Sequence, residues 1–173
     1  MSSLAGKVAI ITGASSGIGA ATAVHFARQG AAVAITGRNA DNLEATARQC
    51  GGEPLVIRAD LGVEEDCTRI IAETVARFGK LDVLVNNAGV LEMGSIESTS
   101  MEQYDRVMNT NMRAVYQLTM MAVPHLTLTR GNIVNVSSVN GIRSFPGKCV
   151  SIVSKDNRIG HENLTLTFSF NYV

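Results

Sequence analysis

The stretch that decides the fold is KVAIITGASSGIGAATAVHFARQG, residues 7–30. It begins with a continuous apolar run, KVAIIT (7–12), passes through a glycine-rich turn and continues as GIGAATAVHFARQG (17–30). The first run is rich in β-branched residues, which is typical of a buried strand, whereas apolar residues at three- and four-residue spacing in the second are typical of a helix. The sequence therefore predicts a strand, a tight turn and a helix in direct succession.

The same alternation continues along the chain to residue 137. Four further apolar runs are predicted as strands: AVAIT (32–36), PLVIRA (54–59), LDVLVN (81–86) and GNIVNVS (131–137). Three further stretches with helical spacing lie between them, at residues 39–50, 64–79 and 101–126. Strands that alternate with helices and are apolar throughout predict an α/β fold, a Rossmann-like doubly wound parallel sheet with right-handed crossovers.

The turn TGASSGIG (12–19) predicts a dinucleotide site because it links a strand directly to a helix. Gly13 permits the tight turn, Gly17 allows the backbone to approach a diphosphate, and Gly19 lets the helix pack closely on the sheet. The N–H groups at the start of the helix then bind the phosphates. No phosphate loop ending in Gly-Lys-Ser/Thr is present, which argues against an NTPase. The cofactor-binding residues predicted in this turn are Thr12, Gly13, Ser15, Ser16, Gly17, Ile18 and Gly19.

The end of the second predicted strand bears on the choice of cofactor. An acidic residue there accepts a hydrogen bond from the ribose 2′-hydroxyl of NAD, but this sequence has Gly37 followed by Arg38. A guanidinium can bind a 2′-phosphate with two hydrogen bonds, so we expect NADP(H) rather than NAD(H); the alternative for Arg38 is a solvated loop arginine. Asp60 and Leu61 follow the third predicted strand and are both predicted to bind the cofactor. Asp60 is expected to accept from the adenine amino group or, alternatively, to belong to the N-cap region of the next helix.

The composition limits the class of partner. The 173 residues contain 15 basic and 15 acidic side chains, so no net charge favours nucleic acid or an anionic membrane surface. The amino-terminal MSSLAGKVAIITG lacks a basic region followed by a long apolar run, and we expect a cytoplasmic protein. Three widely spaced cysteines, Cys50, Cys67 and Cys149, indicate reduced thiols rather than disulfides or a zinc site, and no metal is expected.

Four motifs in order resemble the classical short-chain dehydrogenase/reductase family over residues 5–147: TGASSGIG (12–19), NNAG (86–89), Asn111 and NVSS (135–138). The resemblance implies an NAD(P)-dependent oxidoreductase that moves a hydride between nicotinamide and the carbon of a small alcohol or carbonyl substrate. By the same resemblance, Asn86, Asn87, Ala88 and Gly89 line the cofactor and stabilise the central strand. Asn111 orders a proton-relay water, and Ser138 hydrogen-bonds the substrate oxygen.

The family's proton donor is a tyrosine four residues before a lysine, one helical turn away. The lysine ammonium lowers the tyrosine pKa and binds the nicotinamide ribose. In this sequence SIVSK (151–155) stands in that place, so Ser151 occupies the position of the tyrosine and Lys155 has no catalytic partner. We therefore expect very weak reductase activity, because the proton donor is missing. The three tyrosines of the chain offer no obvious substitute, since Tyr104 and Tyr116 lie in predicted helix and Tyr172 lies near the carboxyl end.

The residues after Gly147 do not continue the family pattern, and we divide the chain into an NAD(P)-binding domain, 1–147, and a divergent tail, 148–173. Gly147-Lys148-Cys149 can be encoded by GGT AAG T, which contains a strong splice-donor sequence, so we hypothesise that the tail is translated from a retained intron. Genomic DNA without a donor at codon 147 would exclude this; the alternative is real divergence. The expected sheet is incomplete at this end, although NLTLTFSFNYV (163–173) alternates with the period of a strand and is a candidate partner for the fifth strand.

Three functional hypotheses follow from the sequence. The first is an NADP-type oxidoreductase with an incomplete active site. The second is a dinucleotide-binding module without catalysis, which acts by binding or by pairing with a complete subunit; the third is a nonfunctional splice product. A homo-oligomer through the methionine-rich helix 101–126 is also expected.

Overall fold

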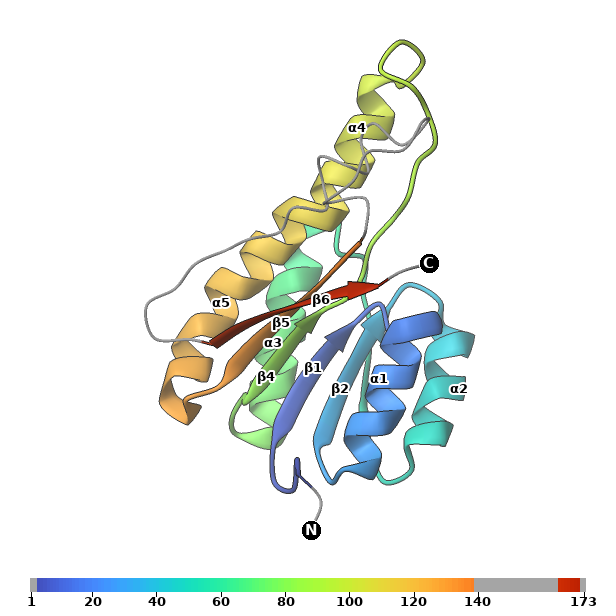
Figure 1. Cartoon of the computed structure of the whole chain (residues 1–173). Helices are drawn as coiled ribbons and strands as arrows, with labels where there is room; N and C mark the ends of the chain where they lie inside the picture. The colour runs from blue at the N-terminus through green and yellow to red at the C-terminus, as the bar shows by residue number, and fades with distance from the viewer. Residues whose placement is uncertain (1–2, 139–164, 172–173) are drawn as a thin grey trace.

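The structure is a computed structural model that describes residues 3–138 and 165–171. Within them, six strands form one sheet in the order β3-β2-β1-β4-β5-β6, and every neighbouring pair is parallel (Figure 1). The strand order reverses between β1 (Val8–Thr12) and β4 (Val83–Asn86). The predicted doubly wound parallel sheet is therefore confirmed, and its switch point lies at the β1–β4 pair.

The other strands are β2 (Ala32–Gly37), β3 (Leu55–Arg58), β5 (Asn132–Ser138) and β6 (Thr165–Asn171). The first five agree with the predicted apolar runs to within two residues at each end. β6 falls in the alternating stretch 163–173 and pairs with the whole of β5, from Asn132 beside Thr165 to Ser138 beside Asn171. The edge that β5 was expected to expose is thus hydrogen-bonded to the tail.

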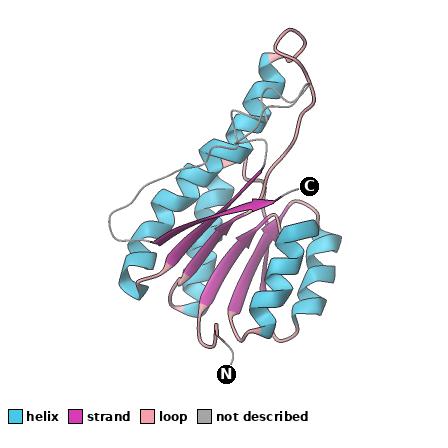
Figure 2. Ribbon diagram, viewed as in Figure 1, coloured by secondary structure: helices cyan, strands magenta, loops and turns pink. Residues whose placement is uncertain are grey.

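Helices cover both faces of the sheet (Figure 2). α1 (Gly17–Arg28) and α2 (Ala40–Cys50) pack on one face, and α3 (Glu64–Phe78) and α5 (Ala114–Thr129) pack on the other. Neighbouring residues of β1 point into different cores: Ile10 joins a cluster with Ile70 and Leu118, and Ile11 joins one with Leu43. Two apolar faces explain why the strands are apolar at every position.

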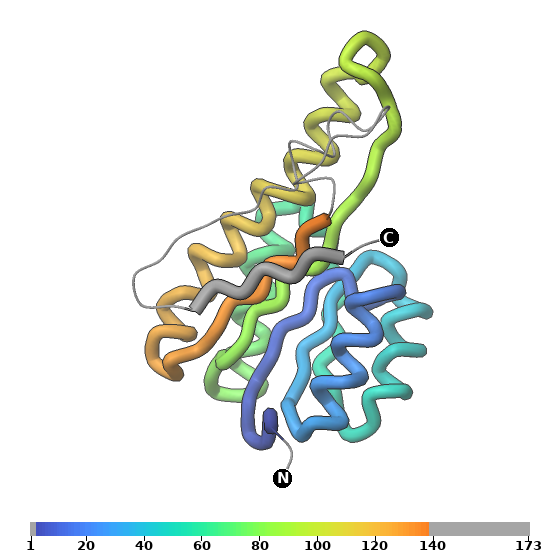
Figure 3. Tube along the Cα trace, in the orientation of Figure 1, coloured from blue at the N-terminus to red at the C-terminus, as the bar shows by residue number. Residues whose placement is uncertain are grey.

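The long helix predicted at 101–126 is not one continuous α-helix. α4 (Met101–Met108) is followed by a π-helical turn (Asn109–Arg113), and α5 then continues to Thr129. A capping box between Ser100 and Gln103 fixes the start of α4, which projects beyond the carboxyl ends of the strands together with the segment that leads to it from β4 (Figure 3). Hydrophobic spacing does not distinguish i+4 from i+5 hydrogen bonding, so the sequence pattern missed the interruption.

A buried carboxylate fastens the amino ends of β1 and β4. Asp82 is 3% exposed, accepts a hydrogen bond of 2.9 Å from the backbone N–H of Val8, and pairs with Lys7 at 3.1 Å and Lys80 at 2.9 Å. Burial raises the pKa of the Asp82 carboxyl, but the bonds from Lys80, Val8 and Lys7 together outweigh it, so the pKa is lowered. Asp82 therefore stabilises the fold in its ionised form.

Asp82→Asn is expected to lower the free energy of unfolding by roughly 1–3 kcal/mol at neutral pH, because the ionised acceptor is lost. Since the folded pKa lies below that of the unfolded chain, the stabilisation by Asp82 is present at neutral pH and is lost as the pH falls through the folded value. Urea titrations over an acidic pH series should show the difference between the two proteins shrinking toward low pH.

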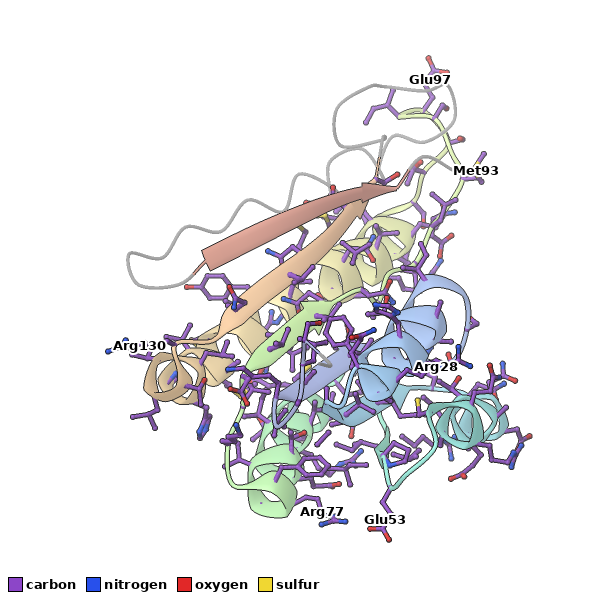
Figure 4. All side chains as sticks on the ribbon, turned by 60° about the horizontal axis from the view of Figure 1, so that its bottom comes forward. Arg28, Glu53, Arg77, Met93, Glu97 and Arg130 are labelled. Atoms are coloured by element: carbon purple, nitrogen blue, oxygen red, sulfur yellow. The ribbon has the colours of Figure 1, made fainter. Side chains whose placement is uncertain are left out.

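The matched control is Glu53→Gln, which removes a carboxylate from an exposed pair with Arg77 at the amino-terminal end of the sheet (Figure 4). We expect no measurable change in stability there. An Asp82→Asn protein as stable as the wild type at neutral pH would contradict the assigned role.

Candidate functional site

A cavity of about 360 Å³ opens at the carboxyl ends of the strands, at the switch point of the sheet. Its walls come from the loops after β1, β2, β3 and β4, segments far apart in the sequence. Eleven of the predicted cofactor residues line it: Gly13, Ser15, Ser16, Gly17, Ile18, Arg38, Asp60, Leu61, Asn87, Ala88 and Gly89. The lining also includes Thr36, Gly37, Ala59, Val90 and Thr110, which were not predicted as site residues although each lies within two residues of one that was.

Three glycines determine the backbone geometry of the turn after β1. Gly13 has φ +67°, and a Cβ there would lie 2.8 Å from Cα of Ala88. Gly19 does not line the cavity; a Cβ on it would collide with the carbonyl of Gly13, so its role is the predicted close packing. Gly17 has φ +54° and open space where a Cβ would stand. The backbone is therefore tightly packed at Gly13 and Gly19 and has open space beside it at Gly17.

The start of α1 has the electrostatics of an anion site. Its N-cap residue, Ser16, makes no side-chain cap, and its first turn contains no acidic residue. In contrast, Asn39 caps α2, Ser100 caps α4, and α3 begins with three acidic residues. The unpaired N–H groups and positive dipole end of α1 are thus available to an anionic group in the cavity. The residues present fit the diphosphate of a dinucleotide.

Thr12 was predicted to bind the cofactor, but the structure gives it a supporting role. It is 1% exposed and does not line the cavity. Its Oγ1 donates to the carbonyl of Val85 at 3.2 Å and accepts from the backbone N–H groups of Asn87 at 2.9 Å and Ala88 at 3.0 Å. The Asn87 side chain in turn donates to the carbonyl of Thr12 at 2.8 Å. Thr12 therefore holds the β4 loop in place as a wall of the cavity.

Asn86 is likewise not a lining residue, and only part of its expected role agrees with the structure. The side chain is buried in the core, where Nδ2 donates to Oδ1 of Asn135 at 2.9 Å and to Oγ1 of Thr119 at 3.4 Å. It joins β4 to β5 and to α5, which is the stabilisation of the central strand that the motif implied. Asn87, the second asparagine of the motif, reaches the cavity instead.

Asp60 lies in the cavity wall, and its own carboxylate accepts from the N–H of Gly62 at 2.9 Å. It is not the N-cap of α3, which is Val63. The backbone N–H of Asp60 donates to Oδ2 of Asp66 at 2.7 Å, and Asp66 also pairs with Arg69 at 2.8 Å. The hydrogen bond from Asp60, followed by that from Arg69, lowers the pKa of the Asp66 carboxyl. Asp66 therefore remains ionised and fixes the turn that carries Asp60.

Asn111 sits in the π-helical turn and is buried. Its side-chain Oδ1 accepts from the N–H of Val90 at 2.8 Å, and its Nδ2 donates to the carbonyl of Val90 at 2.9 Å. The amide therefore fastens the segment after β4, including the lining residue Val90, to the long helix. π turns of this kind are frequent at functional sites. The proposed water-ordering role of Asn111 remains a prediction.

The segment beyond Val90 is also held against α4. Glu92 pairs with Arg106 at 2.9 Å and accepts from Gln103 at 3.1 Å. The hydrogen bonds from Arg106 and then Gln103 lower the pKa of the Glu92 carboxyl. Further along, Met93 and Glu97 lie on the projecting part of the segment, away from the sheet (Figure 4).

The predicted catalytic residues are only partly within the described structure. Ser138 ends β5 at the carboxyl edge of the sheet, three residues after Asn135, but it is not among the residues that line the cavity. Lys155 and Ser151 lie outside the described residues.

Comparison with known proteins supports this arrangement. The family model described as short chain dehydrogenase matches residues 7–161. The chain belongs to the short-chain dehydrogenase/reductase family. The match continues past Gly147 and includes the positions of Ser151 and Lys155. This family consists of oxidoreductases and implies a nicotinamide dinucleotide as the cofactor, which is consistent with the uncapped helix and the cavity described above.

Relatives of this short-chain dehydrogenase/reductase are known from bacteria and plants. An uncharacterized oxidoreductase of Thermotoga maritima is 42% identical over 172 residues, which cover 97% of this chain and 66% of the relative. A 3-oxoacyl-[acyl-carrier-protein] reductase of the same organism is 37% identical over 163 residues, which cover 91% of this chain and 65% of the relative. The solved structure of a Serratia marcescens short-chain dehydrogenase/reductase superposes with a TM-score of 0.84 at 39% identity, and the match covers 88% of this chain and 64% of that one. The chain thus spans somewhat less than two thirds of their length.

Other side chains of this short-chain dehydrogenase/reductase offer little reactive chemistry in the described part of the chain. Cys50 and Cys67 are buried; burial raises the pKa of both thiols, and the pKa of Cys67 reaches about 11 because the carboxylates of Asp66, Glu64 and Asp60 add to the effect. Both therefore remain protonated packing residues. Tyr104 and Tyr116 do not line the cavity. Among the residues described, no helix is both long and apolar enough to span a bilayer.

Proposed function

We propose that the cavity binds NADP(H) and that the chain is an oxidoreductase of small carbonyl or alcohol substrates whose turnover is very weak. One observation supports the choice of NADP(H) above the rest: Gly37 and Arg38 both line the cavity at the end of β2, where an NAD site would place a carboxylate. A Cβ on Gly37 would lie 3.2 Å from Oγ of Ser15, a contact that the Ser15 side chain would have to relieve by a small shift.

The dinucleotide supplies or accepts the hydride of the reaction when it is bound. The chain's own residues bind the dinucleotide and orient the substrate. The start of α1 and the loop of Ser15 and Ser16 face the phosphates, Asp60 faces the adenine, and Arg38 binds the 2′-phosphate. Ser138 is proposed to hold the substrate oxygen, on which negative charge develops during reduction.

The weak turnover follows from the missing proton donor. A carbonyl oxygen that becomes an alkoxide needs an acid within hydrogen-bond reach, and Ser151 cannot replace a tyrosine activated by a lysine. This proposal rests on the sequence, since Ser151 and Lys155 lie outside the described residues.

Arg38→Gln tests the choice of cofactor. We expect the variant to bind NADPH about 10–100-fold more weakly than the wild type, because the 2′-phosphate loses a charge-assisted hydrogen bond, and to bind NADH unchanged. Titrations followed by nicotinamide fluorescence measure both affinities, and the chain contains no tryptophan to interfere. Equal losses for NADPH and NADH would contradict the assignment of Arg38 to the 2′-phosphate.

A second candidate, a binding module that pairs with another subunit, is favoured by the outer face of α5. Tyr116 and Met120 are 63% and 58% exposed, and they border a hollow that also includes Glu64, Arg113 and Gln117. Buried apolar residues occupy the opposite side of α5, so the helix is apolar on two sides. We propose that a second copy of the chain packs on this face. A monomeric mass in light scattering, unchanged by Met120→Lys, would contradict this.

A further inference from the structure

A second arginine, which the sequence pattern did not identify, lies on the strand beside the lining residue Gly37. Arg58 is the last residue of β3 and pairs in register with Gly37 at the end of β2. Register partners on neighbouring strands project to the same face of a sheet. At Gly37 that face points toward Ser15, and both of these residues line the cavity. Arg58 therefore projects to the side on which a 2′-phosphate beside Gly37 would lie.

The guanidinium of Arg58 is also connected to Arg38. Its Nε donates a hydrogen bond of 3.2 Å to the carbonyl of Arg38, and the next residue, Asn39, caps α2 through a 2.9 Å bond from the N–H of Asn42. The main chain of Arg38 is therefore held between Arg58 on one side and a helix cap on the other. Fixing this backbone restricts where the Arg38 side chain can reach.

The main chain of Arg58 is itself fixed from α3. Nη2 of Arg69 donates to the carbonyl of Arg58 at 2.7 Å, while Asp66 accepts from the N–H of Asp60 at 2.7 Å. The Asp66–Arg69 ion pair thus binds the backbone on both sides of Ala59, which lines the cavity. Two helical residues set the position of the strand end that carries Arg58.

The positive charges of Arg38 and Arg58 are not neutralised by a carboxylate partner among the described residues, so an anion can bind beside them. In the described part of the chain, Arg69, Arg77, Arg106 and Arg113 each pair with a carboxylate. Arg38 and Arg58 have no such partner among the ion pairs of the described residues, nor do Arg28, Arg48 and Arg130, but only Arg38 and Arg58 lie at the ends of β2 and β3; the terminal nitrogens of Arg58 make no hydrogen bond in the described part. Two uncompensated guanidinium groups on adjacent strand ends match the charge and the planar hydrogen-bonding geometry of a phosphate.

We propose that Arg58 determines cofactor specificity together with Arg38: it positions Arg38 through the Arg38 carbonyl and contributes a second positive charge to the 2′-phosphate of NADP(H). This inference rests on the proposed binding of NADP(H). A glycine at position 37 suits the site, because a Cβ there would lie 3.2 Å from Oγ of Ser15 and 3.6 Å from Leu43, on the side to which Arg58 projects.

Isothermal titration calorimetry with adenosine 2′,5′-bisphosphate and with 5′-AMP tests the inference without any need for turnover. Wild type is expected to prefer the bisphosphate. Arg58→Gln should lower the affinity for the bisphosphate about 10-fold and leave the affinity for 5′-AMP unchanged. Arg58→Lys should recover part of the loss, because lysine restores the positive charge but not the planar guanidinium that can make two hydrogen bonds to a phosphate. The matched control is Arg48→Gln, which removes an exposed arginine of α2 that does not line the cavity, and should change neither affinity.

The outcomes separate the two proposals. An Arg58→Gln protein with wild-type preference for the bisphosphate, while Arg38→Gln has lost it, would overturn the role of Arg58 alone. A wild type that binds the bisphosphate no better than 5′-AMP would overturn the NADP(H) proposal and the inference with it. Circular dichroism melting of each variant establishes that it is folded. If Arg58→Gln is not folded, Arg58→Lys carries the comparison, and wild-type affinity of that variant for the bisphosphate would overturn the role of the Arg58 guanidinium.

Discussion

Turnover of carbonyl substrates by this chain is expected to be about 10²–10⁴-fold slower than by a relative with an intact Tyr-x-x-x-Lys motif. The reason is that a positioned general acid contributes a factor of this size, equivalent to roughly 3–5 kcal/mol of transition-state stabilisation. NADPH oxidation measured at saturating cofactor, with a panel of ketones and aldehydes, gives the rate. The 3-oxoacyl-[acyl-carrier-protein] reductase of Thermotoga maritima, assayed on its own substrate, serves as the positive control.

A rate comparable to that of the relative would contradict the account, because it would require another proton donor. Ser151→Tyr separates the two causes of slow turnover. A rise of about 10²-fold or more in this variant would place the defect in the side chain at position 151. No rise would place it in the surrounding tail, as the proposed boundary at Gly147 implies.

The largest expected effect on the fold comes from Thr12→Val, which keeps the shape of the side chain and removes its hydroxyl. The backbone N–H groups of Asn87 and Ala88 would both lose their acceptor. Each such loss at a buried group costs about 1–3 kcal/mol, so we expect stability to fall by roughly 2–4 kcal/mol. NADPH binding should weaken as well, since Asn87 and Ala88 form a wall of the cavity. Chemical denaturation and cofactor titration of the same preparation measure both effects.

Thr12→Ser is the matched control, because it keeps the hydroxyl and deletes only the methyl group. We expect it to retain most of the stability and the cofactor affinity of the wild type. If the valine variant is as stable as the wild type and the serine variant is not, the methyl group and not the three hydrogen bonds accounts for the role of Thr12.

The parallel sheet could be predicted because its sequence signals are local and strong. Strands buried on both faces are apolar throughout, and the turn at residues 12–19 places its glycines directly between a strand and a helix. Most of the residues predicted to bind the cofactor line the cavity, because they occupy the loops at the carboxyl ends of these strands. Gly13 and Gly19 were assigned roles in tight turning and close packing, and the structure confirms both.

Other features depend on tertiary contacts that spacing does not encode. Thr12 belongs to the glycine motif but is buried and does not line the cavity. Asn86 and Asn87 are adjacent in sequence, yet Asn86 is buried in the core and Asn87 lines the cavity. Arg58 gave no signal because its importance comes from the register of β3 on β2. The π turn at Asn111 shares its hydrophobic spacing with an ordinary helix. The division of the chain at Gly147 and the origin of residues 148–173 remain predictions.

The central claim is that this chain binds NADP(H) at the switch point of its sheet even though its catalysis is impaired. Titration of the purified protein with NADPH, followed by nicotinamide fluorescence and by displacement with adenosine 2′,5′-bisphosphate, tests it most directly. The account predicts saturable binding at one site per chain that the bisphosphate reverses. Absence of binding by a folded protein would contradict it and would leave the family as a statement about ancestry alone.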